Sequence, residues 1–225
     1  MGKGTSAQRD GFYGVPTTDA QRVALANSAP IWFNTEKGWE ESYYAPSNLS
    51  GLTVRGLNSS APAGWYPVEG SGPKILLSSN GTIQNMATGS VFINWAAPGT
   101  AFSWRRGGSD HIEFASGIVK PKIWGRYRCN ISLSIQTGSG TAAFTMVHYT
   151  DTGVQAYTYS TSTVTLNTSL QDRFDLSVEN VQLSPNESLR AFASNLGGAN
   201  LGVLGASLSS ASYFLEYIGP ALVSE

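Results

Sequence analysis

Apolar and polar positions alternate along the second half of the chain, most clearly in Arg126–Gln136. The apolar positions of this segment are Tyr127, Cys129, Ile131, Leu133 and Ile135. A period of two places them on one face, which is typical of a half-buried strand in an antiparallel sheet. Shorter apolar or alternating segments are Ile75–Leu77, Val91–Trp95, His111–Phe114, Ala142–Tyr149, Val154–Ser160, Phe174–Val178 and Leu189–Ala193. Turn residues separate these segments, so an antiparallel β-sandwich or jelly roll is expected from about His111 to Pro220.

The last predicted strand, Ser212–Ile218, departs from simple alternation because both of its faces carry large apolar groups. Burying one such side chain stabilises a protein by roughly 1.5–3 kcal/mol, and leaving several exposed invites aggregation. We therefore expect both faces to be buried, either centrally in the domain or against another subunit.

The first 70 residues follow a different pattern. Met1–Val15 is polar and punctuated by glycine, and we expect an extended arm that a partner orders. A short helix is predicted over Thr18–Asn27, with Thr18 and Gln21 as a capping box. Ile31–Tyr44 is expected to form a β-hairpin. The Ser/Gly/Pro-rich stretch Pro46–Gly72 is predicted to be a connector, which divides the chain into modules 1–70 and 71–225.

Aromatic residues gather in the first module, which has few aliphatic residues to cover them. Such aromatics mark either an interface or a sugar-binding face, and we place the interface first. The residues predicted to attach the module to a partner are Arg9, Phe12, Tyr13, Trp32, Phe33, Trp39, Tyr43, Tyr44 and Trp65.

Composition and net charge argue against several classes of function. Charged residues are 13% of the 225 residues and the net charge is -1, so nucleic-acid binding is not expected. Cys129 is the only cysteine, which rules out an internal disulfide and a zinc site built on several thiolates. No apolar stretch approaches the roughly 20 residues of a membrane span, and the polar start does not resemble a signal peptide.

Several short motifs contain residue types used in catalysis. Asp151-Thr-Gly153 matches the aspartic-protease signature, and Ser109-Asp110-His111 contains the residue types of a hydrolytic triad. Both are better explained as turns, because a protease needs a second carboxylate and neighbouring residues on an extended chain point apart. His148 is expected to be an ordinary strand residue, and the Arg105-Arg106 pair a surface turn. We therefore predict no enzyme, with no catalytic residue, cofactor or metal ion; a hydrolase using Asp151 or His111 is one alternative.

Three segments of the chain resemble known proteins: GTSAQRD at Gly4–Asp10, VPTTDAQRVALA at Val15–Ala26 and WFNTEKGWEESYY at Trp32–Tyr44. They resemble the N-terminal attachment region of small virion proteins of tailed bacteriophages, particularly those that infect actinobacteria. GWYP at Gly64–Pro67 continues that region. GRYR at Gly125–Arg128 and SYFLEYI at Ser212–Ile218 look similar to the C1q/TNF-like jelly rolls that cap phage fibres.

The resemblance implies a mainly β protein in which an arm, short helix and hairpin precede a C1q/TNF-like jelly roll. It implies a homotrimer on the virion surface, assembled in the bacterial host cytoplasm, with Tyr213, Leu215 and Tyr217 at the trimer contact. Its partners would be the major capsid or tail proteins, without membrane insertion. We expect a capsid decoration or head-fibre protein; a minor tail protein or a receptor-binding module that recognises host surface glycan is the alternative.

Overall fold

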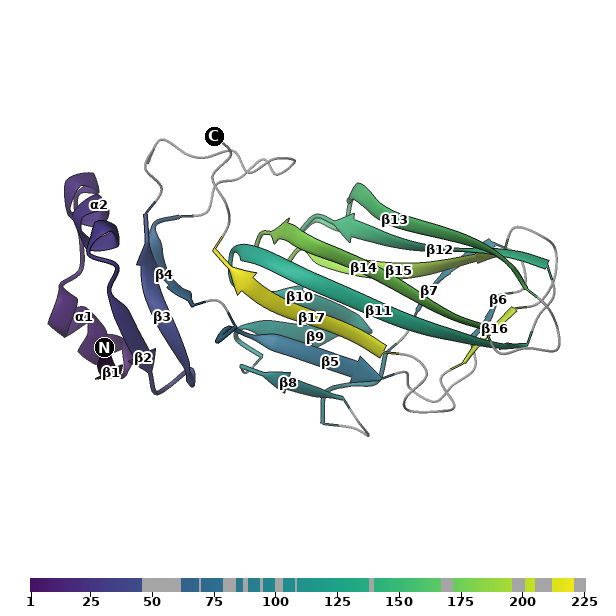
Figure 1. The fold of residues 1–225 in the computed structure, drawn as a ribbon, viewed down its shortest axis with the longest axis horizontal. Coiled ribbons are helices and arrows are strands. Elements are labelled where there is room, and N and C mark those ends of the chain that lie inside the picture. The colour runs from purple at the N-terminus through teal and green to yellow at the C-terminus, as the bar shows by residue number, and fades with distance from the viewer. Residues whose placement is uncertain are drawn as a thin grey trace.

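The computed structural model describes residues 1–45, 62–68, 70–78, 84–86, 89–93, 95–99, 103–107, 109–137, 140–166, 172–195, 201–204 and 212–220. A small N-terminal module lies at one end of a longer sandwich of strands (Figure 1). The predicted boundary near Gly70 falls between the last strand of the module's sheet and the first strand of the sandwich.

The N-terminal module is a four-stranded sheet with two helices on the face that points away from the sandwich (Figure 1). Its elements are β1 (Gly2–Gly4), α1 (Ser6–Tyr13), α2 (Asp19–Asn27), β2 (Ile31–Asn34), β3 (Trp39–Tyr44) and β4 (Gly64–Pro67). The predicted helix is confirmed as α2, with Thr18 and Gln21 forming the capping box. The predicted hairpin is confirmed as β2 and β3, and Gly38 in its turn has φ +74°.

The extended arm predicted over residues 1–15 is wrong, because this segment forms β1 and α1. Thr5 caps α1 through a second capping box, with Gln8. Strand β1 pairs in parallel with β2, and a Cβ at Gly2 would lie 2.2 Å from the Trp32 ring. Contact with Trp32 therefore orders β1, and the local sequence pattern does not reveal that contact. Strand β4 likewise lies inside the predicted connector, whose residues 46–61 are outside the described part.

The remaining strands form two facing sheets and a hairpin. The first sheet runs β6-β16-β11-β17-β5-β8, with β14 on the free side of β11; the second runs β13-β12-β15-β7; β9 pairs with β10. The bounds are β5 (Lys74–Ser78), β6 (Gln84–Met86), β7 (Gly89–Phe92), β8 (Trp104–Arg106), β9 (Ile112–Ala115), β10 (Ile118–Pro121), β11 (Gly125–Thr137), β12 (Gly140–Tyr149), β13 (Gln155–Leu166), β14 (Asp172–Leu183), β15 (Ser188–Asn195), β16 (Leu201–Leu204) and β17 (Ser212–Gly219).

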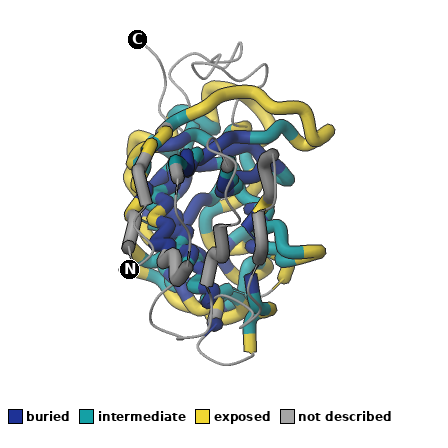
Figure 2. The backbone as a smooth tube through the Cα atoms, turned by 90° about the vertical axis from the view of Figure 1, so that its right-hand side faces the viewer, coloured by how far each residue is buried: buried dark blue, intermediate teal, exposed yellow. Residues whose placement is uncertain are grey.

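The long strands cross between the two sheets, which defines a jelly roll. The chain passes from β11 in one sheet to β12 and β13 in the other, returns to β14, and crosses again to β15 before it ends at β17. The fold is therefore mainly β, with an antiparallel sandwich of jelly-roll type, as predicted. On β11 the inward positions Tyr127, Cys129, Ile131 and Leu133 are all buried, which confirms the alternation in this strand. Buried segments line the space between the sheets (Figure 2).

Candidate interaction surfaces

The core of the N-terminal module holds a buried carboxylate. Glu41 on β3 is 1% exposed and accepts hydrogen bonds from three side chains. Arg9 Nη1 lies 2.5 Å from Glu41 Oε2, Lys37 Nζ lies 2.7 Å from Oε1, and Asn34 Nδ2 lies 3.0 Å from Oε2. Burial alone would raise the pKa of Glu41, but the bonds from Lys37 and Asn34 and the charges of Lys37 and Arg9 outweigh it, so the pKa lies below its ordinary value.

Sequence reasoning missed Glu41 as a structural residue, although a signal was present. Strand β3 alternates buried and half-buried positions, with Trp39, Glu41 and Tyr43 on its buried face. Strict alternation from two buried aromatics therefore places Glu41 inside the module. A buried carboxylate must be paired, and the pairing cations come from α1 and from the hairpin turn.

Four of the nine predicted attachment residues are buried within the chain. Arg9, Trp32, Trp39 and Tyr43 are between 1% and 8% exposed, so these four predictions are wrong as surface contacts. The aromatic rings cover one another in place of aliphatic residues: Tyr13 lies 6.1 Å from Trp32 and 5.2 Å from Trp65, centroid to centroid. Tyr13, Phe33, Tyr44 and Trp65 are half-buried, and Phe12 is 73% exposed.

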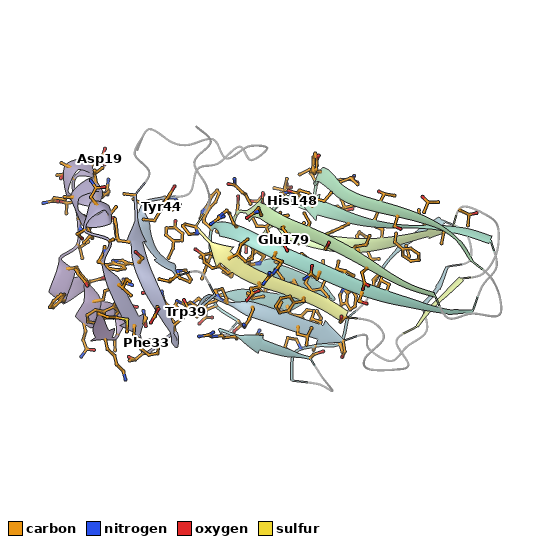
Figure 3. All side chains as sticks on the ribbon, in the orientation of Figure 1. Asp19, Phe33, Trp39, Tyr44, His148 and Glu179 are labelled. Carbon is orange, nitrogen blue, oxygen red and sulfur yellow. The ribbon has the colours of Figure 1, made fainter. Side chains whose placement is uncertain are left out.

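Trp39 joins the module to the sandwich, and Figure 3 shows it between the two. Its ring lies edge-on to His111, with centroids 4.5 Å apart. A Cβ at Gly107 would lie 2.7 Å from the Trp39 ring, and Gly107 also has φ +80°. Arg106 Nη2 donates to the Gly38 carbonyl at 3.1 Å. Burial, with the Lys37 charge, lowers the pKa of His111 below its ordinary value, so this junction favours neutral imidazole.

Apolar surface remains exposed on the module. Seven large apolar side chains are exposed among the described residues: Met1, Phe12, Val15, Ile31, Phe92, Val154 and Tyr157. The first four lie within the first 31 residues. A shallow groove between the end of α1 and α2 is lined in part by Tyr13, Val15, Pro16 and Leu25. Exposed apolar groups gathered in this way are typical of a contact surface.

The predicted trimer residues Tyr213, Leu215 and Tyr217 are 1%, 0% and 0% exposed within a single chain. They point into the sandwich, where the Tyr213 hydroxyl donates to the Leu189 carbonyl at 3.2 Å. Side chains that are already covered have no area left to bury against another copy, so their assignment to a trimer contact is wrong. The other alternative for this strand, burial in the centre of its own domain, explains these three residues.

The opposite face of β17 is the outer face of the sandwich. It carries half-buried Phe214 and Ile218 on either side of Glu216, which is 8% exposed. Glu216 is ion-paired with Arg128 on β11, and Lys74 on β5 lies 3.5 Å away. We call Leu76, Phe214, Glu216, Ile218, Arg128 and Lys74 the outer-face group. Its charges are largely neutralised within the sheet, and its apolar groups are only partly covered.

The two motifs that contain catalytic residue types do not assemble a site among the described residues. Asp151 lies in the exposed turn between β12 and β13, where Gly153 has φ +81°. Ser109 and Asp110 are exposed, whereas the His111 ring packs on Trp39. His148 is buried on β12, with its Nε2 3.2 Å from Glu187 Oε2. Both motifs are therefore turns, as expected.

Three further features concern metal ions, membrane-spanning helices and the cysteine thiol. Within the described ranges, no group of three or more His, Cys, Asp or Glu side chains is placed to hold a metal ion. Across the same ranges, no helix is long and apolar enough to cross a membrane. The thiol of Cys129 is buried in the core, and burial raises its pKa to about 12.

Known structures with a similar fold include two of murine APRIL and one of Eiger TNF from S. frugiperda. APRIL at pH 8.0 is 13% identical with a TM-score of 0.49, and APRIL at pH 8.5 is 14% identical with a TM-score of 0.48; each match covers 65% of this chain and 98% of APRIL. Eiger TNF is 10% identical with a TM-score of 0.44, covering 66% of this chain and 94% of that one. No protein-family model and no curated protein matches the sequence. The fold assignment above rests on the strand order of the two sheets.

Proposed function

We propose that this protein is a non-enzymatic structural protein on the surface of a tailed-phage virion. In this proposal residues 1–70 attach to a capsid or tail protein and the jelly roll projects as a trimer, in the manner of a capsid decoration or head fibre. The observation that carries the proposal is the exposed apolar surface of the N-terminal module. Phe12 is 73% exposed and Val15 68%, although the same module buries four of its other predicted contact residues.

The attachment surface we propose consists of Phe12, Val15 and Ile31, together with the groove between α1 and α2. Burial of a large apolar side chain at an interface contributes roughly 1.5–3 kcal/mol, so two such residues decide whether a weak contact forms. Glu41 and its ion-pair partners hold the interior of the module together. The exposed side chains lie outside that interior, so they can be changed without disturbing the fold.

Attachment is tested by adding purified protein to phage particles that lack it. The variant Phe12→Ser/Val15→Ser should lose most of its binding to particles and keep its melting temperature. Val154→Ser is the matched control, because Val154 is 63% exposed but lies in a turn of the sandwich. Separated capsids and tails then identify the partner. Equal binding by the double variant and the control would overturn the assignment of this surface.

For the trimer we propose the outer-face group in place of Tyr213, Leu215 and Tyr217. Phe214 and Ile218 are half-buried apolar residues on the outer face of β17, beside ion pairs that lessen the charge of that face. This face has apolar residues on both sides of a paired carboxylate, and such a mixed surface with its charges already paired suits contact with identical subunits.

Light scattering tests the oligomer directly. The chain has a mass of 23.9 kDa, and a trimer should scatter with three times that mass. Phe214→Glu should shift the protein to monomers with an unchanged circular dichroism spectrum, whereas Tyr157→Glu, at an exposed site on β13, should remain trimeric. A wild-type monomer would defeat the trimer proposal and leave the attachment proposal standing.

A second candidate function is recognition of host cell-surface glycan by a minor tail protein or receptor-binding module. The observation that favours it is an aromatic group around Arg190 on the outer side of the second sheet. Phe92 lies 4.0 Å from Phe192 and 6.0 Å from Tyr149, centroid to centroid, and Phe92 is 41% exposed. Exposed aromatic faces are typical of sugar sites. Loss of adsorption to host cells when Phe92 is changed to Ala would support this function, and unchanged adsorption would count against it.

A further inference from the structure

Arg190 differs from the other arginines whose side chains the structure describes. The arginines at positions 9, 22 and 128 are ion-paired with carboxylates. Those at positions 105, 106 and 126 donate hydrogen bonds to backbone carbonyl groups. In the described part of the chain, Arg190 donates a hydrogen bond only through Nε, to the Ser188 hydroxyl at 3.1 Å. Within the described ranges no carboxylate lies within ion-pair distance of its guanidinium.

Aromatic rings hold the guanidinium of Arg190 in place. Its central carbon lies 4.3 Å from the centroid of the Tyr149 ring and 5.4 Å from that of Phe92. Burial lowers the pKa of Arg190 from its ordinary value, which reflects the cost of partly removing this charge from water. A half-buried arginine remains charged, so an anion that reached its terminal nitrogens would gain charge-assisted hydrogen bonds.

A cavity of about 130 Å³ opens beside this group. Its inner wall is formed by buried Ile93, Trp95, Val119, Leu189 and Tyr213, and its rim includes Phe92, Arg190 and the β9–β10 turn at Ser116 and Gly117. A cavity of about 150 Å³ holds a six-membered ring in other proteins. The volume here is smaller than that, so a pyranose ring enters it only in part and its hydroxyl groups stay at the open rim.

The topology explains why the cavity exists. Strand β7 pairs with the second half of β15, and the ladder between them ends where the Ile93 N–H donates to the Ala191 carbonyl at 3.0 Å. The β9–β10 hairpin approaches the first half of β15 from the same side. The cavity lies at the junction of these two segments, and both contribute to its lining.

We infer that this cavity and the Arg190 aromatic group bind a pyranose ring that carries a carboxylate, the unit found in acidic polysaccharides. The carboxylate is held by the fork of the Arg190 guanidinium, and the apolar face of the ring lies against the aromatic wall. The Ser116 hydroxyl and the backbone of its turn are available to the ring hydroxyls. The inference deepens the second candidate function by naming its ligand class and site.

Calorimetric titration of the wild-type protein with trigalacturonate and with its neutral methyl ester tests the ligand class. The acid should bind at least 10-fold more tightly than the ester, because one charge-assisted hydrogen bond corresponds to about 10-fold or more in affinity. Rising salt should weaken only the acid. No binding, or equal binding of acid and ester, would overturn the inference. Tighter binding of benzoate than of the uronate would overturn the sugar class.

Two variants and a control test the site. Arg190→Gln should weaken binding of the acid at least 10-fold and leave the affinity for the ester unchanged. Arg190→Lys should recover part of the lost affinity. Phe92→Ala should weaken both ligands. Tyr157→Ala is the control, because Tyr157 is 59% exposed but lies on β13, away from the cavity. If Arg190→Gln bound the acid like wild type, the site would be wrong.

Failure of this inference is distinguishable from failure of the second candidate function. The titrations use purified protein and measure only the ligand and its site. Adsorption of phage to host cells measures the function. If adsorption depended on the jelly roll but the protein did not bind uronate, this ligand would be wrong and the receptor-binding function would stand.

Discussion

The N-terminal module and the jelly roll bury their interiors with different chemistry. The sandwich has a large core of aliphatic and aromatic residues, including Leu77, Ile131, Leu133, Phe144 and Leu215, each at most 1% exposed. The module instead packs aromatic rings, many of them edge-on, around a buried ion pair between Glu41 and Arg9. A small domain buries a smaller share of its surface, so it depends more on large rings and on fully paired polar groups.

This difference changes how aromatic residues in a short segment should be interpreted. An excess of aromatics over aliphatics suggested that the module's rings face a partner, yet Trp32 and Trp39 are buried within the chain itself. Among the described residues of the module, the large apolar side chains that remain exposed are those of Met1, Phe12, Val15 and Ile31. In the sandwich, by contrast, alternation alone separated core from surface on β11.

The sandwich core should be the most sensitive part of the molecule. Phe144 is 0% exposed in the middle of β12, and Phe144→Ala should lower the free energy of unfolding by about 3–5 kcal/mol through lost burial and the cavity left behind. Urea unfolding at fixed chain concentration measures the change. Val154→Ala, at an exposed site, should change it by less than about 0.5 kcal/mol. A loss below about 1 kcal/mol for Phe144→Ala would mean that the core is not packed as described.

The module should depend on its buried ion pair. Glu41→Gln leaves Arg9 and Lys37 without their shared carboxylate, and we expect a loss of about 2 kcal/mol in the free energy of unfolding. Asp10 still contacts Arg9, which limits the loss. Glu40→Gln, on the adjacent half-buried position, is the control and should have little effect. Equal losses from the two changes would show that the buried pair contributes nothing particular.

The junction between the regions can be tested with two glycines of matched backbone. Gly107 and Gly153 have φ +80° and +81°, but only Gly107 faces a ring, that of Trp39. Gly153→Ala should cost about 1 kcal/mol for the left-handed backbone. Gly107→Ala should cost roughly 2 kcal/mol, because Trp39 must also move. Equal melting temperatures for the two variants would contradict the close docking of Trp39.

Acid should weaken the module and its junction with the sandwich. The folded protein holds the pKa of His111 below 6.5 and that of Glu41 below 4.5, their ordinary values. The unfolded chain therefore binds more protons, so the stability from His111 is complete above about pH 6.5 and is lost as pH falls below it. The stability from Glu41 is complete above about pH 4.5 and is lost at lower pH.

Urea midpoints measured from pH 7 to pH 3 check this dependence. His111→Phe should remove the step at higher pH, and Glu41→Gln should remove the step at lower pH. A wild-type midpoint that rises on acidification would contradict both assignments.

Much of the architecture could be predicted from local pattern. The Thr18–Gln21 capping box and the turn at Gly38 act over a few residues, so the helix and the hairpin were predicted correctly. Alternation on Arg126–Gln136 correctly identified the inward face of β11. Strand β1 could not be predicted, because Gly2 is ordered by contact with Trp32, 30 positions later in the chain.

The last predicted strand, Ser212–Ile218, carries apolar residues on both faces. Part of its burial follows from the sequence alone and part only from the tertiary structure. Its composition determined that both faces are at least partly covered, because large apolar groups avoid water. Only the tertiary structure decided that Tyr213, Leu215 and Tyr217 face the chain's own core and that Phe214 and Ile218 face outward. Pairing with β11 on one side and β5 on the other fixes that choice. A period of two gives the two faces of a strand, and only the facing sheet determines which of them becomes the core.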